Sequence, residues 1–399
     1  MTFRYEIYDA IDQVPAVSWQ SVCPPGSDIF MDARLLRVFE QTLAATASFH
    51  YVVVYDSAGS PVAAACLSMC ELDAALFCSG FVANAIRCLR RIWPSYLKFR
   101  TLFCGLPFSA GQCHVRVSPA ASSPSGLPAV AGSLHAAALS LARRHRLRLI
   151  VFKEFSAAEE TMMRQLERLG YIRGESLPMN CAGMRFSCLD DFCACLRSHY
   201  RYKINRSRRK FHAAGLRVEH LAGQAVLDAY TDEVHCLYDA VVDAADVHLE
   251  RLPARFFREL ASALPENVKL TTARYQGRIV AFAWSLFADD VYRDLFVGID
   301  YNLNLDCDLY FNLMLNDLDA AFRTGAREIY MGQTADVFKS RLGCRQEARY
   351  VCARVLPTWL KLPFRATSRW LFPPPAPAPA RDLFRDSPLG PLDTPTDMK

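Results

Sequence analysis

Two stretches of this chain have the pattern of apolar runs and turn residues that is typical of β-hairpins. The first covers residues 51–67, where valines and alanines flank the polar turn 56–60. The second covers residues 270–284 and turns at Gln276-Gly277. Glycine and short polar residues favour tight turns, and β-branched and aromatic residues favour strands. The two hairpins are similar enough in length and order to be copies of one unit.

Each hairpin is followed by the same series of elements. A helical pattern leads to a short apolar strand and then to Arg-Leu-Gly, over residues 133–145, 147–152 and 168–170 in the first copy and 310–323, 327–331 and 341–343 in the second. This order predicts a duplicated α/β unit of about 170 residues, within the normal size of a domain. We therefore expect an α/β fold with mixed sheets, in an N-terminal domain over 1–180 and a C-terminal domain over 186–356.

A strand, a polar loop and a helix follow one another in the second copy. The strand covers residues 292–297 and the loop covers 300–306. Apolar residues then recur at helical spacing, at Phe311, Leu315, Leu318 and Phe322. The first N–H groups of a helix are free and lie at the positive end of its dipole, which suits an anionic ligand. We therefore expect Asp308 and Leu309, where this helix begins, to bind the pyrophosphate of a cofactor.

Residues 191–214 are strongly basic and have a helical pattern that Gly215 ends. Apolar residues at helical spacing predict one buried face, made of Phe192, Leu196, Tyr200, Ile204 and Phe211. Arg201 and Arg208 lie along the edge of that face. One interpretation is a solvated basic face. The other is that these guanidinium groups bind phosphate at a cleft, since they pair with phosphate oxygens in a bidentate way.

Two motifs in the second half carry a family resemblance. The basic segment 198–210 resembles the serine-arginine-isoleucine-basic segment that opens the second domain of Fem-type aminoacyl transferases and their GNAT-like relatives. The ending Phe338-Lys339-Ser340-Arg341-Leu342-Gly343 resembles the acetyltransferase-like domain of the same group, where an aromatic residue, a lysine and a glycine recur. The resemblance covers residues 185–355. The first half of the chain resembles the family only in the order of its predicted strands and helices.

The resemblance implies two tandem GNAT-like domains that move an acyl or aminoacyl group onto an amine. It also implies that Lys339 holds a donor phosphate or the developing anion, and that Arg201 and Arg208 contact phosphate or substrate. Because the first copy has Leu166 where the second has Lys339, we expect the chemistry in the second domain. Arg341 is expected to be a surface charge.

Amine acylation also needs a base and a proton donor near the reacting carbonyl. Asp294 is a candidate base, and an exposed strand carboxylate is the alternative interpretation. Tyr310 is a candidate proton donor to a leaving thiolate, and a core aromatic residue is the alternative. His235 and Asp239 have the His-x-x-x-Asp spacing of condensation-type acyltransferases, but their helical surroundings favour an i,i+4 pair.

These patterns together predict an N-acyltransferase that moves the acyl group of acyl-CoA, or of an acyl carrier protein, to the amine of a small molecule or amino acid. Residues 302–309 lack the glycines of the loop that binds coenzyme A in GNAT enzymes. Two alternatives therefore stay open: a Fem-type transferase that uses aminoacyl-tRNA, and a non-catalytic binding module on a decayed GNAT fold. No Gly-x-Ser-x-Gly, Walker or dinucleotide motif supports a hydrolase, nucleotidase or dehydrogenase.

Composition places the chain among ordinary globular proteins. It is 52% hydrophobic and 22% charged, and its net charge of +5 does not require a nucleic-acid partner. No apolar run approaches the roughly 18 to 20 residues that span a bilayer, and the start lacks a signal-peptide pattern. We therefore expect a cytoplasmic protein without membrane insertion.

Cysteines and prolines change the picture little. Fifteen cysteines are scattered along the chain, and Cys193 and Cys195 point to opposite sides of a helix, so we expect reduced thiols and no metal site. The Pro/Ala tract 373–379 predicts a disordered tail over 373–399. The apolar residues of 359–372 are expected to dock on the second domain.

Overall fold

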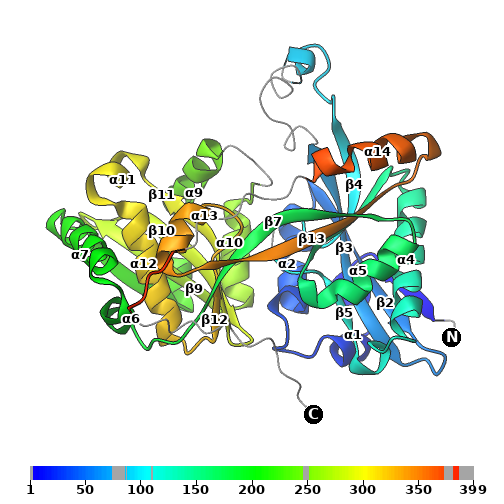
Figure 1. Ribbon diagram of the computed structural model, residues 1–399, viewed down its shortest axis with the longest axis horizontal. Coiled ribbons are helices and arrows are strands. Elements are labelled where there is room, and N and C mark those ends of the chain that lie inside the picture. The colour runs from blue at the N-terminus through cyan, green and yellow to red at the C-terminus, as the bar shows by residue number, and fades with distance from the viewer. Residues whose placement is uncertain are drawn as a thin grey trace. The chain divides into compact units, whose positions relative to one another are not determined.

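The computed structural model describes residues 3–73, 86, 88–108, 111–245, 251–372 and 381–385. The chain forms two compact units (Figure 1). Unit 1 contains Met1–Pro178, Val247–Phe256 and Ala348–Ala376, and unit 2 contains Met179–Asp246, Phe257–Glu347 and Pro377–Lys399. The first boundary lies close to the expected limit of 180. Residues 348–356, which we expected in the second domain, belong to unit 1.

Unit 1 is a sheet of mostly antiparallel strands with one parallel pair. Its strands are hydrogen-bonded in the order β1 (Arg4–Tyr8), β2 (Ala47–Tyr55), β3 (Pro61–Asp73), β4 (Lys98–Cys104), β6 (Leu149–Phe155) and β13 (Arg345–Val355), and β5 (Val115–Val117) pairs with β3. The first predicted hairpin is confirmed as β2 and β3, with Val53 opposite Ala64. β4 and β6 are parallel, as Leu102 opposite Ile150 shows.

Helices cover both faces of the unit 1 sheet because successive strand residues point to opposite sides. The helices are α1 (Ala16–Val22), α2 (Ala33–Leu43), α4 (Leu127–Arg144) and α5 (Glu160–Arg168). On β2, Val52 and Val54 pack in the core cluster that contains the apolar residues of α4. Tyr51, on the opposite side, meets Trp19 of α1 edge to face at 5.7 Å. The alternation of β2 therefore fixes two layers of helices around one sheet.

Unit 2 repeats this plan. Its strands are hydrogen-bonded in the order β7 (Ile172–Gly183), β12 (Glu328–Tyr330), β11 (Val291–Ile299), β10 (Arg278–Ala288), β9 (Val268–Tyr275) and β8 (Arg217–Ala222). The second predicted hairpin is confirmed as β9 and β10. Its turn residues Gln276 and Gly277 have φ of +50° and +82°, the mirror-image turn that matches the twist of paired strands. β11 and β12 are parallel, like β4 and β6.

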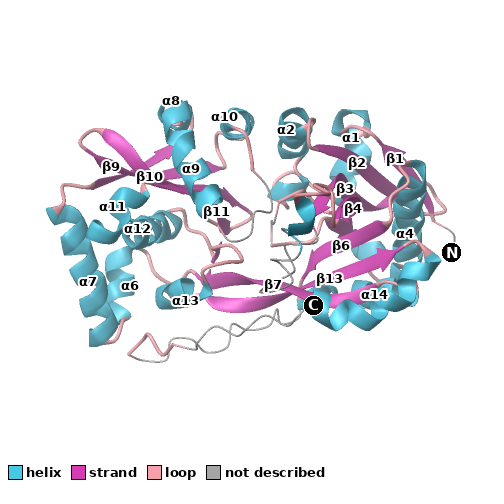
Figure 2. Cartoon of the chain, turned by 90° about the horizontal axis from the view of Figure 1, so that it is seen from above, coloured by secondary structure: helices cyan, strands magenta, loops and turns pink. Residues whose placement is uncertain are grey.

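The helices of unit 2 lie on both sides of its sheet. α8 (Gln224–Ala229) and α9 (Asp232–Ala244) lie on one side of β9 and β10, and α7 (Ser198–Ala213) and α12 (Leu309–Arg323) lie on the other (Figure 2). His235 and Asp239 form the expected i,i+4 pair on α9, with Nε2 and Oδ2 separated by 3.8 Å. No helix in the described ranges has both the length and the apolar character needed to cross a bilayer.

Each unit takes its last strand from the other half of the sequence. β7 follows the Leu169-Gly170 ending of the first copy and pairs with β12 in unit 2. β13 follows the Leu342-Gly343 ending of the second copy and pairs with β6 in unit 1. This exchange explains why residues 348–356 do not stay with the second copy.

Two predicted segments differ from the structure at a helix boundary. The expected polar loop 300–306 is a short helix, α11 (Tyr301–Cys307), which ends at Asp308 in the left-handed conformation (φ +51°) before α12 begins. The Asp300 side chain caps α11 by accepting from the N–H of Asn302, which is the local reason that these polar residues turn helical.

The basic segment 191–214 is two helices rather than one. α6 (Leu189–Cys195) ends at Leu196, whose backbone is extended, and α7 begins at Ser198. Four residues of the predicted buried face, Phe192, Leu196, Ile204 and Phe211, are buried, and the fifth, Tyr200, is half-buried and lines a pocket described below.

The end of the chain also departs from expectation. α14 (Thr358–Leu371) follows β13, and Phe364 and Phe372 pack on Leu149 and Val151 of unit 1, not on the second domain. Residues 373–380 and 386–399 of the expected disordered tail lie outside the described residues. Residues 381–385, also expected to be disordered, lie against unit 2 with Leu383 and Phe384 buried, because apolar side chains there find a partner surface.

Acid should destabilise unit 1 through His114, which is fully buried. Burial, followed by repulsion from Lys153, lowers the pKa of His114 well below its usual range. Below the unfolded pKa of about 6.5, His114 binds a proton in the unfolded chain but not in the folded chain. The contribution of neutral His114 to the free energy of unfolding is therefore fully present above that pH and is lost as pH falls. We expect the parent to lose about 1 kcal/mol more unfolding free energy than His114→Phe between pH 7 and pH 5.5. Urea titrations at both pH values measure this, and equal losses would contradict the assignment.

Candidate functional site

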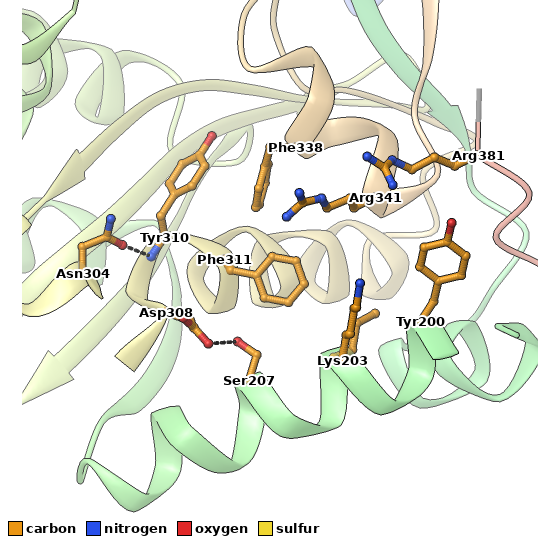
Figure 3. A pocket seen from close by; sticks show the side chains of 11 residues that line it. Tyr200, Lys203, Ser207, Asn304, Asp308, Tyr310, Phe311, Phe338, Arg341 and Arg381 are labelled. Atoms are coloured by element: carbon orange, nitrogen blue, oxygen red, sulfur yellow. Dashed lines mark hydrogen bonds between the residues drawn. The ribbon is translucent and has the colours of Figure 1, made fainter. Parts of the chain in front are cut away.

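A pocket of about 510 Å³ opens in unit 2, within the size range of small-molecule sites. It lies where α7, the α11–α12 junction, α13 (Asp336–Lys339) and the chain near Arg381 meet (Figure 3). Its lining residues are Tyr200, Lys203, Ile204, Ser207, Asn304, Asp308, Tyr310, Phe311, Phe338, Arg341 and Arg381. The predicted helix start and the predicted family ending therefore contribute to one pocket.

Asp308 holds the junction of α11 and α12 to α7. Its carboxylate accepts a hydrogen bond from Ser207 Oγ at 3.0 Å and one from Lys210 Nζ at 3.2 Å. The Asn304 side chain accepts from the N–H of Tyr310 at 2.9 Å (Figure 3). One of the helix-start donors is thus already used, and the Asp308 side chain is an anchor. Leu309 is fully buried.

Three cationic side chains project into the pocket. Lys203 comes from α7, Arg341 from the short turn Ser340–Leu342, and Arg381 from the C-terminal segment (Figure 3). Arg381 is fixed by its Nε, which donates to Ser340 Oγ at 3.0 Å. We call Lys203, Arg341 and Arg381 the cationic cluster. Since the one carboxylate in the lining, Asp308, is paired with Lys210, the cluster favours an anionic ligand.

Arg201 and Arg208, the expected phosphate ligands, do not line this pocket. Arg208 pairs with Asp190 at 3.1 Å, and Arg201 donates to the carbonyl of Ala194 at 3.4 Å. Both arginines therefore connect α7 to α6. Arg341 is exposed, as expected for a surface charge, and it also lines the pocket, because the turn after α13 directs it there.

Lys339 and Asp294 are buried near one another behind this lining. Only 5% of Lys339 and 6% of Asp294 is exposed, and neither side chain makes a hydrogen bond or an ion pair within the described part of the chain. Burial raises the pKa of Asp294 well above its usual range, and the charge of Lys339 opposes that rise. Burial likewise lowers the pKa of Lys339, and Asp294 opposes the change. Asp294 is thus not an exposed strand carboxylate.

A second buried carboxylate, Asp317 on α12, shows by contrast what a fully bonded acid looks like. It accepts hydrogen bonds from Thr271 Oγ1 at 2.8 Å, Tyr292 OH at 2.8 Å and Ser285 Oγ at 3.1 Å. Its charge contributes to the raised pKa of Asp294. Buried polar groups are normally bonded in this way, whereas Oδ1 of Asp294 is buried without a hydrogen-bond partner.

Tyr310 links the pocket to the buried charges. Its ring packs on Phe338 with centroids 4.7 Å apart, and both rings line the pocket. Burial, then the charge of Asp294, raises the pKa of Tyr310. Tyr310 is therefore a protonated phenol at neutral pH and is able to donate a proton. Of the three residues predicted for catalysis, Asp294 is close enough to influence the pKa of both Lys339 and Tyr310.

Sequence reasoning missed Lys203, Asn304 and Arg381. Lys203 is one of several basic residues on α7, and its helical position next to the buried face was the available signal. Asn304 and Arg381 gave no local signal, because their roles depend on residues brought close by the fold. Within the described part of the chain no group of acidic, cysteine and histidine side chains is arranged to hold a metal ion.

Comparisons with known proteins concern the family and the fold of the chain. A family model described as FemAB-like, peptidoglycan biosynthesis/recognition, matches residues 99–300, just over half of the 399 residues. The crystal structure of FemX has a TM-score of 0.56 at 10% identity and covers 90% of this chain and 99% of its own. A tandem GNAT protein from the clavulanic acid biosynthesis pathway has a TM-score of 0.51 at 10% identity, covering 89% and 99%.

The two solved structures confirm the expected fold of tandem GNAT-like domains. No curated protein sequence matches this chain.

Replacing both buried charges should leave unit 2 at least as stable as before. Apolar or neutral groups of similar size often match or exceed buried charged pairs in stability, by up to about 4 kcal/mol. We therefore expect Asp294→Asn with Lys339→Met to keep or raise the unfolding free energy in urea. A large loss in the double variant would mean that the charges serve structure.

The single variant Lys339→Met should behave differently, because it leaves the Asp294 carboxylate buried without a compensating charge. We expect it to lose about 3 to 5 kcal/mol at neutral pH. The folded pKa of Asp294 is raised, so the lost stability returns as pH falls through that pKa towards the unfolded value of about 3.9. Urea titrations from pH 7 to pH 4 measure the recovery; a deficit independent of pH would contradict it.

Proposed function

We propose that this chain, which belongs to the FemAB-like family of peptidoglycan biosynthesis and recognition, transfers an acyl or aminoacyl group to an amine, with the chemistry in unit 2. One observation carries the proposal: a pocket with three cationic side chains lies against the buried group of Lys339, Asp294 and Tyr310. The cations suit an anionic donor, and the buried group supplies an acid, a base and a positive charge.

Each residue of the buried group has a distinct proposed role. The amine nitrogen of the acceptor attacks the donor carbonyl carbon, and Asp294 takes the proton that the nitrogen loses; burial raises the pKa of Asp294, which makes its carboxylate a stronger base. Lys339 stabilises the negative charge on the carbonyl oxygen. As the bond to the leaving group breaks, Tyr310 donates its phenolic proton to that group.

The first candidate donor is an acyl thioester of coenzyme A or of an acyl carrier protein. The cationic cluster supports it, because both carriers contain phosphate groups, with which guanidinium groups pair well. Residues 302–309 lack glycines, and the N–H of Tyr310 is used by Asn304. Side-chain cations would therefore do what backbone N–H groups do in other phosphate sites.

The second candidate donor is aminoacyl-tRNA. It is favoured by the exposed basic side chains of α7, which are Lys203, Arg206, Arg209 and Lys210. Lys203 belongs both to this row and to the pocket lining, so a phosphate backbone on α7 would lead into the site. The acceptor is the amine of a small molecule or amino acid, and the family description makes a peptidoglycan precursor one class to test.

Ligand-induced stabilisation should separate the donors. Any ligand of the folded state raises the melting temperature by mass action. We expect an acyl-CoA thioester to raise it, whereas a response to charged tRNA alone, falling steeply with salt, would identify the second donor. No response to either would favour a binding module without transferase activity. Uncharged tRNA and free coenzyme A are the matched controls.

Lys339→Ala should lower turnover by at least about tenfold with the identified donor, which corresponds to about 1.4 kcal/mol of transition-state stabilisation. The reason is the loss of the only positive charge of the buried group. Arg278→Ala is the control for lost charge, because Arg278 is exposed at the β9–β10 turn of the same unit. Steady-state kinetics with Lys339→Ala at parent levels would refute the role of Lys339.

A further inference from the structure

Residues Arg381–Arg385, which we call the C-terminal strap, are joined to unit 2 by backbone pairing. Leu196 and Phe384 form an antiparallel bridge. The N–H of Arg197 donates to the carbonyl of Leu383 at 2.9 Å, and the N–H of Arg385 donates to the carbonyl of Cys195 at 3.0 Å. The strap thus pairs like a short strand with the point where α6 ends and α7 has not yet begun.

This pairing accounts for the break between the two helices. A continuous helix would use the backbone groups of Cys195 and Arg197 internally, whereas the break directs them to the strap. The Arg197 side chain adds two contacts, since its Nε donates to the carbonyl of Phe384 at 3.0 Å and its guanidinium pairs with Asp382. The binding site for the strap at the α6–α7 break is therefore made of specific hydrogen bonds and an ion pair, and is not only an apolar surface.

Apolar side chains hold the strap in place. Leu383 is 3% exposed and Phe384 is 6% exposed. The Phe384 ring stacks on Phe186 with centroids 5.8 Å apart and meets Phe192 edge to face at 5.9 Å. Burying two large apolar side chains gives the strap a fixed position from which Arg381 extends.

Arg381 reaches the pocket from this fixed position. Its Nε donates to Ser340 Oγ, next in sequence to Arg341, so both guanidinium groups enter the pocket from the same side (Figure 3). Lys203 faces them from α7. A phosphoryl group offers several oxygens to several donors, which is the geometry that two guanidinium groups and an ammonium group match best.

We propose that the C-terminal strap is a working part of the substrate site, in which Arg381 joins Arg341 and Lys203 to bind a phosphoryl group. The inference deepens the proposed function and rests on it for the identity of the pocket as the donor site. The phosphoryl group belongs either to a nucleotide-bearing thioester or to the 3′ end of an RNA. In both cases the strap determines how tightly the donor is held.

Calorimetric titration tests this with two probes, adenosine 3′,5′-bisphosphate for the nucleotide source and the trinucleotide CCA for the RNA source. Adenosine, which lacks phosphate, is the control ligand. We expect one probe to bind the full-length protein and Arg381→Ala to weaken it about tenfold, or about 1.4 kcal/mol, with adenosine binding unaffected. Arg381→Lys should lose less, because it keeps the charge but not the fork of donors.

Stability measurements separate binding from structure. Arg381→Ala keeps Leu383 and Phe384, so its melting temperature should stay at the parent value, and Arg278→Ala should change neither property. Phe384→Ser should lower both the melting temperature and probe affinity, because it releases the strap. Equal probe affinity in the parent and Arg381→Ala would overturn the proposal, as would a parent that binds neither probe.

The outcome is distinguishable from failure of the proposed function. If Arg381→Ala lowers the affinity for a phosphate probe while Lys339→Ala leaves turnover unchanged, the role of the strap is supported and the proposed transfer mechanism is wrong. If Lys339→Ala abolishes turnover while Arg381→Ala binds and turns over normally, the strap is a structural closure only.

Discussion

The burial of Asp294 and Lys339 is the constraint on which the site in unit 2 depends. Two opposite charges without hydrogen-bond partners are expensive in an interior where Asp317 shows how completely an acid can be satisfied. Each charge reduces the cost of keeping the other ionised. Burial still dominates for both groups, so the pKa of Asp294 is raised and the pKa of Lys339 is lowered.

Two helix interruptions position elements that line the site. At Asp308 the chain turns through a left-handed residue, and the carboxylate ties the turn to Ser207 and Lys210 of α7. At Leu196 the chain leaves the helix to pair with Phe384. Without the first interruption α11 and α12 would be one rod, and without the second the strap would have no backbone partner. The interruptions thus fix the start of α12 and the position of Arg381, both of which contribute to the pocket lining.

The two units have the same plan, yet the chemistry is expected in one of them. Each has a hairpin, a third antiparallel strand, a helix and a parallel strand, and each is completed by a strand from the other half of the chain. The fold therefore explains how unit 2 supports a pocket, and the side chains of α7, α13 and the strap explain what that pocket can bind. Unit 1 carries Leu166 at the position that corresponds to Lys339, and Leu166 is fully buried.

The sequence by itself determined the hairpins, the helix of α12 and most of the buried face of α6 and α7, because periodicity and turn residues are local properties. Only the tertiary structure decided that Asp294 is buried, that Arg341 lines the pocket and that Arg201 and Arg208 do not. The tertiary structure also decided the strand exchange and the place where the C-terminal strap binds unit 2. These features depend on residues far apart in the chain, such as Ser207 with Asp308 at a separation of 101 residues and Ser340 with Arg381 at 41. Which residues are buried and which are paired depends on how segments far apart in the chain pack together, and no short stretch of sequence encodes that packing.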